Sequence, residues 1–204
     1  NNEFMHTVIY GPPGTGKTET AHIIGGIYSK LGILKNNVFK KVTRADLIAG
    51  YLGQTAIKTT EVVKSAIGGV LFIDEAYALG NTEKKDSFAK ECIDTLCESL
   101  SNHKHELMVI IAGYEEDLKK CFFSYNQGLD SRFIWRFKID DYTPEELQLI
   151  FNKKVKECGW TIDNISSSWF KKHNNYFKYF GRDMETLLSK VKIAHSRRVF
   201  CLSE

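Results

Sequence analysis

The chain has 204 residues, of which 43% are hydrophobic and 26% are charged, as in an ordinary globular protein with a buried core. Its formal net charge of +3 is too weak to argue for a nucleic acid or a membrane surface as partner. The five cysteines are odd in number and lack C-x-x-C spacing, so we expect reduced thiols in a cytoplasmic protein without a membrane span.

Short apolar runs rich in β-branched residues alternate with helical patterns over the first two thirds of the chain. This alternation predicts a parallel sheet with helices on both faces. The predicted strands are residues 6–10, 37–42, 69–73, 107–112 and 135–139. Because the first strand begins almost at once, we expect the sequence to be a fragment of a longer protein.

Two helices are predicted between these strands, over residues 17–31 and 87–100. Gly25 and Gly26 interrupt the first helix, which suggests close backbone packing on the sheet. The residues expected on the buried stripe of this helix are Ala21, Ile24, Tyr28 and Leu31.

The character of the chain changes after the fifth predicted strand. Thr143, Pro144 and Glu146 form a helix start with a capping box, and no further strand is evident. We therefore predict an α/β domain over residues 1–141 and a small all-α domain over 142–204. Aromatic residues interleaved with lysines at 167–180 could stack nucleic-acid bases, but a small helical core explains them better.

A phosphate-binding loop, G-x-x-x-x-G-K-[ST], joins the first predicted strand to the first helix. Its glycines let backbone N–H groups turn toward phosphate oxygens, and the helix N-terminus favours negative charge. Lys17 is expected to reach the β- and γ-phosphates, and the Thr18 hydroxyl to ligate Mg²⁺. The predicted nucleotide-binding residues of the loop are Gly11, Pro12, Pro13, Gly14, Thr15, Gly16, Lys17 and Thr18.

An acidic pair ends the third predicted strand. Asp74 is expected to hold the Mg²⁺ shell together with Thr18, and Glu75 to act as general base toward the attacking water. The alternative is a pair of strand-end acids that cap the next helix. The sequence has no N-K-x-D motif of a GTPase and no L-S-G-G-Q-like signature of an ABC-type ATPase.

The motifs together resemble the AAA+ ATPases, in particular the CbxX/CfxQ branch with the red-type Rubisco activases and the sporulation stage V protein K group. The matching stretches are GPPGTGKT, VTRADLIAGYLGQTAIKT, GGVLFIDEAYAL, VIIAGYEEDL, GLDSRF and GRDMETLL. The resemblance implies a five-stranded parallel sheet of order 5-1-4-3-2, a helical lid and a ring, usually hexameric, with ATP bound between subunits.

Three further site residues follow from the resemblance. Arg132 of GLDSRF occupies the place of the trans-acting arginine finger, with Arg136 as the alternative. Arg182 of GRDMETLL matches sensor 2, which contacts the γ-phosphate. Tyr114 stands where many relatives carry the smaller polar residue called sensor 1, and its bulkier phenol could donate to the attacking water or the γ-phosphate.

The Gly-flanked loop after the second strand carries an aromatic residue, a leucine and a glycine. In ring ATPases of this type, such a loop faces the central channel, and Tyr51, Leu52 and Gly53 are the predicted substrate-gripping residues. The alternative is that Tyr51 packs against the next helix. The basic cluster just before the loop, formed by lysines at 35, 40 and 41 with Arg44, is expected to be solvated.

The sequence thus predicts an ATPase that couples Mg·ATP hydrolysis to remodelling of a protein substrate. One alternative is a nucleotide-gated scaffold that assembles with little turnover. A DNA-handling AAA+ protein is a second alternative, against which the mild charge argues.

Overall fold

The computed structural model describes residues 3–51, 53–163 and 165–200, and it divides into two compact units. The first unit holds Lys17–Ile139 and the residues up to Gly11. The second holds Pro12–Gly16 and the residues from Asp140 onward. Five residues of the phosphate loop thus cluster with the C-terminal unit, which the sequence did not lead us to expect.

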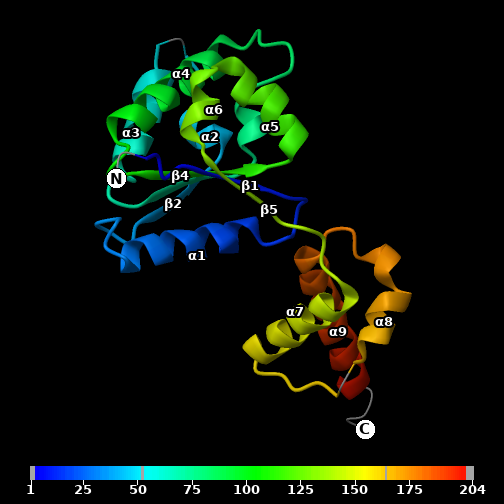
Figure 1. Cartoon of the computed structure of the whole chain (residues 1–204). Helices are drawn as coiled ribbons and strands as arrows, with labels where there is room; N and C mark the ends of the chain where they lie inside the picture. The colour runs from blue at the N-terminus through cyan, green and yellow to red at the C-terminus, as the bar shows by residue number, and fades with distance from the viewer. Residues whose placement is uncertain (1–2, 52, 164, 201–204) are drawn as a thin grey trace. The chain divides into compact units, whose positions relative to one another are not determined.

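A parallel five-stranded sheet is the centre of the first unit, in the order β2-β3-β4-β1-β5 (Figure 1). This order is the predicted 5-1-4-3-2 arrangement read from the other edge, so the fold prediction is confirmed. The strands are β1 (Thr7–Tyr10), β2 (Phe39–Val42), β3 (Val70–Ile73), β4 (Met108–Gly113) and β5 (Trp135–Lys138).

Helices cover both faces of this sheet, with α1 on one face and the remaining helices of the unit on the other (Figure 1). The α-helices are α1 (Lys17–Lys30), α2 (Arg44–Leu47), α3 (Thr55–Lys64), α4 (Ser87–Asn102), α5 (Glu115–Cys121) and α6 (Gly128–Arg132). Two 3₁₀ helices, η1 (Ala76–Leu79) and η2 (Phe123–Tyr125), complete the unit.

Alternate strand residues feed two separate cores, as the period-2 geometry of strands requires. In β3, Leu71 and Ile73 pack with α3 and α4, whereas Val70 and Phe72 pack with α1. The central strands β1, β3 and β4 are buried along their whole length, which explains their continuous apolar sequences.

The prediction for α1 is right at Gly25 and wrong at Gly26 and Leu31. A Cβ on Gly25 would lie 2.7 Å from Val70 Cγ2, so this glycine does allow close packing on β3, whereas Gly26 has no atom within 4 Å of such a Cβ. Leu31 is 68% exposed because the helix ends at Lys30 and the chain turns away.

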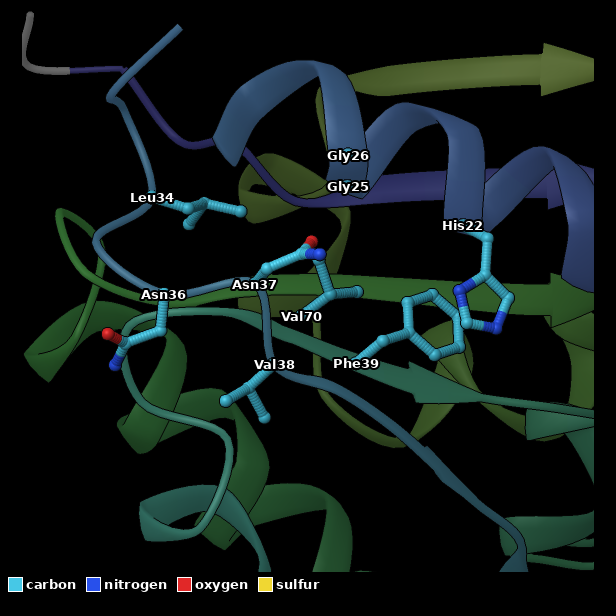
Figure 2. A pocket seen from close by; sticks show the side chains of 9 residues that line it. All are labelled: His22, Gly25, Gly26, Leu34, Asn36, Asn37, Val38, Phe39 and Val70. Atoms are coloured by element: carbon cyan, nitrogen blue, oxygen red, sulfur yellow. The ribbon is translucent and has the colours of Figure 1, made fainter. Parts of the chain in front are cut away.

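The missing side chain of Gly25 also leaves room for a pocket of about 170 Å³ beneath α1 (Figure 2). One wall is the imidazole of His22, which stacks on the ring of Phe39 with centroids 3.5 Å apart. The pocket is lined mainly by apolar groups and asparagines from α1, β2 and the segment between them.

His6 is a fully buried polar residue just before β1. Its Nδ1 accepts a hydrogen bond from the Val109 N–H at 3.1 Å, so Nε2 carries the proton and donates to the Leu100 carbonyl at 3.2 Å. Burial, with a contribution from the nearby Arg132 guanidinium, lowers the pKa of His6 to about 4. The ring is therefore neutral in the folded protein at pH 7.

His6 should make the protein sensitive to mild acid. The unfolded chain takes up a proton near pH 6.5 and the folded chain only near pH 4, so the stability from neutral His6 is complete above 6.5 and is lost as the pH falls toward 4. Between pH 7 and pH 5 the loss from this group is about 2 kcal/mol. Urea denaturation of wild type and His6→Gln at both pH values measures it. Equal pH dependence in the two proteins would contradict the assignment.

The regular secondary-structure elements of the second unit, among the residues described, are all helices, as predicted. It contains α7 (Pro144–Glu157), α8 (Ser167–Lys172), η3 (Asn174–Tyr176) and α9 (Gly181–Phe200). The predicted start of α7 is confirmed, with Thr143 as N-cap, Pro144 in the first turn and Glu146 closing the capping box at 2.8 Å.

The aromatic segment of the second unit mainly supplies its core, as predicted. Phe170, Phe177 and Phe180 are buried there with residues from α7 and α9. Trp169 and Tyr176 are exposed at the surface. In the described parts of the chain, helices long and apolar enough to cross a bilayer are not found.

Candidate active site

The phosphate loop leaves β1 at Tyr10 and enters α1 at Lys17, the strand–loop–helix context that the motif requires. Gly14 and Gly16 have φ angles of 81° and 83°, which only glycine adopts easily. The Lys17 ammonium donates a hydrogen bond to the Gly11 carbonyl at 2.9 Å. The backbone of the loop thus requires glycine at positions 14 and 16.

Within the second unit, lid residues bind this loop directly. The Tyr142 hydroxyl donates to the Thr15 carbonyl at 2.8 Å, and the Gly181 N–H donates to the Gly14 carbonyl at 3.0 Å. A Cβ on Gly14 would lie only 1.9 Å from the Tyr179 carbonyl oxygen. The start of α9, where Arg182 is the second residue, thus lies on the loop.

Tyr142 is a residue that the sequence reasoning missed. Burial, and next the carboxylate of Glu146, raise the pKa of its phenol, so the hydroxyl keeps its proton and remains a donor to the loop. The sequence feature that could have indicated this role is the position of Tyr142 immediately before the helix N-cap Thr143. The cap fixes the backbone there and so limits where the preceding side chain can reach.

Asp74 follows β3 directly at the carboxyl edge of the sheet, where ligands bind in open α/β folds. Its backbone N–H donates to the Val42 carbonyl at 3.1 Å, which ties it to the end of β2. The carboxylate forms an ion pair with Lys41 at 2.7 Å, and the same ammonium lies 3.4 Å from the Thr18 hydroxyl.

The oxygen donors fit a Mg²⁺ site. One cation, the Lys41 ammonium, already contacts both the Thr18 hydroxyl and the Asp74 carboxylate, so the two oxygens can share a cation. Mg²⁺ commonly takes one or two protein ligands and completes its octahedron with waters and phosphate oxygens. No cluster of three or more His, Cys, Asp or Glu side chains suited to a metal occurs among the described residues.

Glu75 has an unusual backbone, with φ of 51° and ψ of 46°. This left-handed conformation costs a non-glycine residue on the order of 1–3 kcal/mol and is commonly found at functional sites. Tyr77 lies beside it: burial and then the Glu75 carboxylate, which also hydrogen-bonds the phenol, raise the pKa of Tyr77. Tyr77 is a second residue that the sequence reasoning missed.

Tyr114 follows β4 and is the N-cap of α5. Since β4 pairs with β1 at Gly113 and Tyr10, Tyr114 enters the same carboxyl edge as the phosphate loop. Its ring centroid is 6.2 Å from that of Tyr77, and 41% of the residue is exposed. The structure thus brings a second phenol toward the Glu75 neighbourhood.

The two candidate finger residues occupy different places. Arg132 ends α6, where its Nε donates to Ser101 Oγ at 2.8 Å and its Nη1 to the Gly128 carbonyl at 2.6 Å. Arg136 in β5 pairs with Asp130 at 2.7 Å and donates to the Tyr10 hydroxyl at 3.3 Å.

Arg132 lies near His6, which precedes β1, whereas the phosphate loop follows that strand. The two ends of a four-residue strand are roughly 10 Å apart. Arg132 therefore lies near the start of β1, whereas Gly11 follows the other end of that strand.

The loop between α2 and α3 presents Tyr51 to solvent, with 74% of the residue exposed. The base of the loop is anchored by the Lys58 ammonium, which donates to the Ala45 and Ile48 carbonyls at 2.6 and 3.0 Å. Gly53 has a φ of 78°. Leu52 lies outside the described residues.

The basic cluster before this loop is partly exposed, as predicted, but two of its side chains also pair within the protein. Arg44 donates to the carbonyls of Ala78 and Leu79 at 2.9 and 2.7 Å and pairs with Asp86 at 2.6 Å. Lys41 pairs with Asp74. These partners come from distant parts of the chain, so the local sequence carries no sign of them.

An open pocket of about 490 Å³ connects the acidic pair to the anchored start of the exposed loop. It is lined by Thr43, Arg44, Ala45, Ile48, Asp74, Glu75 and Ala78. The first unit thus combines the Lys17 ammonium, the Thr18 hydroxyl and the adjacent carboxylates of Asp74 and Glu75.

The chain resembles known proteins in both sequence and fold. Residues 7–127 match the model of the ATPase family associated with various cellular activities (AAA). A cfxQ-like protein, R730, of Acanthamoeba polyphaga mimivirus is 46% identical over 201 residues, covering 97% of this chain and 50% of the relative. The stage V sporulation protein K of Bacillus subtilis is 40% identical over 195 residues, covering 96% and 58%.

Two other similarities cover a shorter stretch or have a lower identity. The ESX-3 secretion system protein EccA3 of Mycobacterium tuberculosis is 46% identical over 152 residues, covering 74% of this chain and 24% of the relative. The crystal structure of the FIGL-1 AAA domain in complex with ADP has a TM-score of 0.66 at 20% identity, covering 96% and 62%. The chain spans 50% and 58% of the length of the cfxQ-like protein and the stage V sporulation protein K, and 24% of EccA3. The match to the family model and these relatives show that the chain belongs to the AAA ATPase family.

Proposed function

We propose that the protein is a Mg²⁺-dependent ATPase that uses hydrolysis to remodel a protein substrate. The observation that carries this proposal is the meeting of Thr18, Asp74 and the strained Glu75 at one sheet edge, immediately after the phosphate loop. We assign its work to a cytosol-like compartment, because the cysteines of the described residues are free thiols.

The roles of the residues follow from their chemistry. Lys17 and the loop N–H groups bind the phosphates, while Thr18 and Asp74 would hold Mg²⁺, which neutralises phosphate charge when bound. The Glu75 carboxylate accepts a proton from water as the water oxygen attacks the γ-phosphorus and ADP leaves. Arg182 and Tyr114 are proposed to contact the γ-phosphate or the water.

We further propose a ring in which Arg132 of one subunit reaches the ATP of the next, and in which Tyr51, Leu52 and Gly53 contact the substrate chain. The exposure of Tyr51 and the anchored base of its loop support this role, since a gripping side chain must be free while its support is fixed. A steady-state ATPase assay on the full-length protein tests the proposal: ATP binding without turnover would favour a nucleotide-gated scaffold.

Tyr51→Ala is expected to abolish substrate retention without changing the melting temperature, because the exposed ring contributes little packing. The measurement compares proteins retained in ATP by Glu75→Gln, which should stall with substrate bound, and by the Glu75→Gln, Tyr51→Ala double variant. Tyr176→Ala is the matched control, as Tyr176 is 78% exposed on the second unit. A lower melting temperature for Tyr51→Ala would instead support a packing role.

A further inference from the structure

Lys41 occupies the place where the proposed Mg²⁺ site requires a metal. Its Nζ lies 2.7 Å from Asp74 Oδ2 and 3.4 Å from Thr18 Oγ1, the two side chains proposed to bind the ion. The cation that bridges these two oxygens in this structure is thus a side chain of the protein itself.

The strand register explains how Lys41 reaches this position. Lys41 is opposite Phe72 in the β2–β3 pair, and Phe72 stands two residues before Asp74. The Lys41 ammonium lies 5.8 Å from the Phe72 ring centroid. Phe39, two residues earlier in β2, packs on the α1 side of the sheet. Because residues two apart in a strand point to the same face, Lys41 also faces α1, which contains Thr18. Lys40 points to the opposite face, where its ammonium donates to Ser65 Oγ at 2.8 Å.

The ammonium and a bound Mg²⁺ exclude one another. Mg²⁺ needs its oxygen ligands at 2.0–2.1 Å, so an ion bound to Thr18 and Asp74 would lie in the space now held by Lys41 Nζ. Two cations in contact also repel. Lys41 must therefore leave when the metal binds, and it can do so because 47% of its side chain is exposed and its four-carbon stem is flexible.

We propose that Lys41 is a counter-ion within the protein that competes with Mg²⁺ for Asp74 and Thr18. It thereby raises the Mg²⁺ concentration at which the metal has half of its effect on nucleotide binding. This inference rests on the proposed function, since it concerns the same nucleotide site. In the absence of metal, the Asp74 carboxylate and the Thr18 hydroxyl share the Lys41 ammonium.

A different role for Lys41 would be direct binding of a phosphate group. Both roles involve a positive charge next to the nucleotide, but they predict opposite effects of removing it. A competitor of the metal lowers metal affinity, so its loss strengthens Mg²⁺ binding. A phosphate ligand raises nucleotide affinity, so its loss weakens ADP binding even without metal.

The test measures binding of a fluorescent ADP analogue to the full-length protein over a series of free Mg²⁺ concentrations and in EDTA. In Lys41→Met, the Mg²⁺ concentration at half-effect should fall about two- to five-fold, the range expected for removing an exposed ion pair. Affinity in EDTA should be unchanged. Lys40→Met is the matched control, because it removes a neighbouring lysine from the other face of β2, and its Mg²⁺ dependence should equal that of the wild type.

Three results would overturn the inference. An unchanged or higher half-effect concentration in Lys41→Met would show that Lys41 does not compete with the metal. Weaker ADP binding by Lys41→Met than by the wild type in EDTA would identify Lys41 as a phosphate ligand. A wild-type protein that binds ADP without any Mg²⁺ dependence would contradict the proposed function itself. Lys41→Gln repeats the test with a polar side chain should Lys41→Met fold poorly.

Discussion

Replacing Glu75 by Gln should leave ATP binding intact and lower steady-state ATP hydrolysis by about 100-fold or more. General-base catalysis contributes roughly 10²–10⁴-fold, and an amide cannot accept the proton from water. Gln retains the size of Glu and can adopt the same left-handed backbone at similar cost, so the change isolates the carboxylate. ATP binding and hydrolysis are measured on the same preparation.

The control for this change is Glu83→Gln. Glu83 is a largely exposed acid in the segment that follows η1, and it pairs with Lys85 at 3.3 Å. Its replacement should leave hydrolysis at the wild-type rate, because it lies outside the residues assigned to the site. Wild-type turnover in Glu75→Gln would rule out Glu75 as the base.

Arg132→Ala and Lys17→Ala should each be inactive alone, yet regain hydrolysis when the two proteins are mixed and allowed to assemble. In a mixed ring, an Arg132→Ala subunit keeps its own phosphate loop and a neighbouring Lys17→Ala subunit supplies the arginine. Since an arginine finger contributes about 10³-fold or more, the regained activity should stand well above that of either protein.

Mixing also separates catalysis from folding. Arg132 holds Ser101 and the Gly128 carbonyl in its own chain and lies near the buried His6, so its removal could lower stability as well as activity. A misfolded subunit would not restore activity in the mixture. If Arg136→Ala, and not Arg132→Ala, is inactive alone and regains activity when mixed with Lys17→Ala, Arg136 would be assigned as the arginine finger.

Much of the fold was predictable because its signals are local. The capping box at Thr143 and the glycines of the phosphate loop each fix a backbone conformation within a few residues. The sheet order, by contrast, came from the family resemblance. Leu31 was misplaced because helical spacing continues past a helix end that the pattern itself does not mark.

The contacts around the candidate site were harder to predict because they join segments far apart in the sequence. The Lys41–Asp74 pair depends on the register between β2 and β3, which no short pattern specifies. The Tyr142–Thr15 bond joins residues 127 positions apart. Such pairings become visible only when the strands and the second unit are folded.

The contact between Gly14 and Tyr179 makes the sequence constraints on the two positions unequal. Position 179 contributes a main-chain carbonyl oxygen to this contact, so its side chain can change without altering it. A side chain is not tolerated at position 14, because even a methyl group would collide with that oxygen whether or not nucleotide is bound. Gly14→Ala would therefore disturb the contact with Tyr179 as well as any contact with phosphate. A loss of ATP affinity in this variant would not by itself identify a phosphate contact.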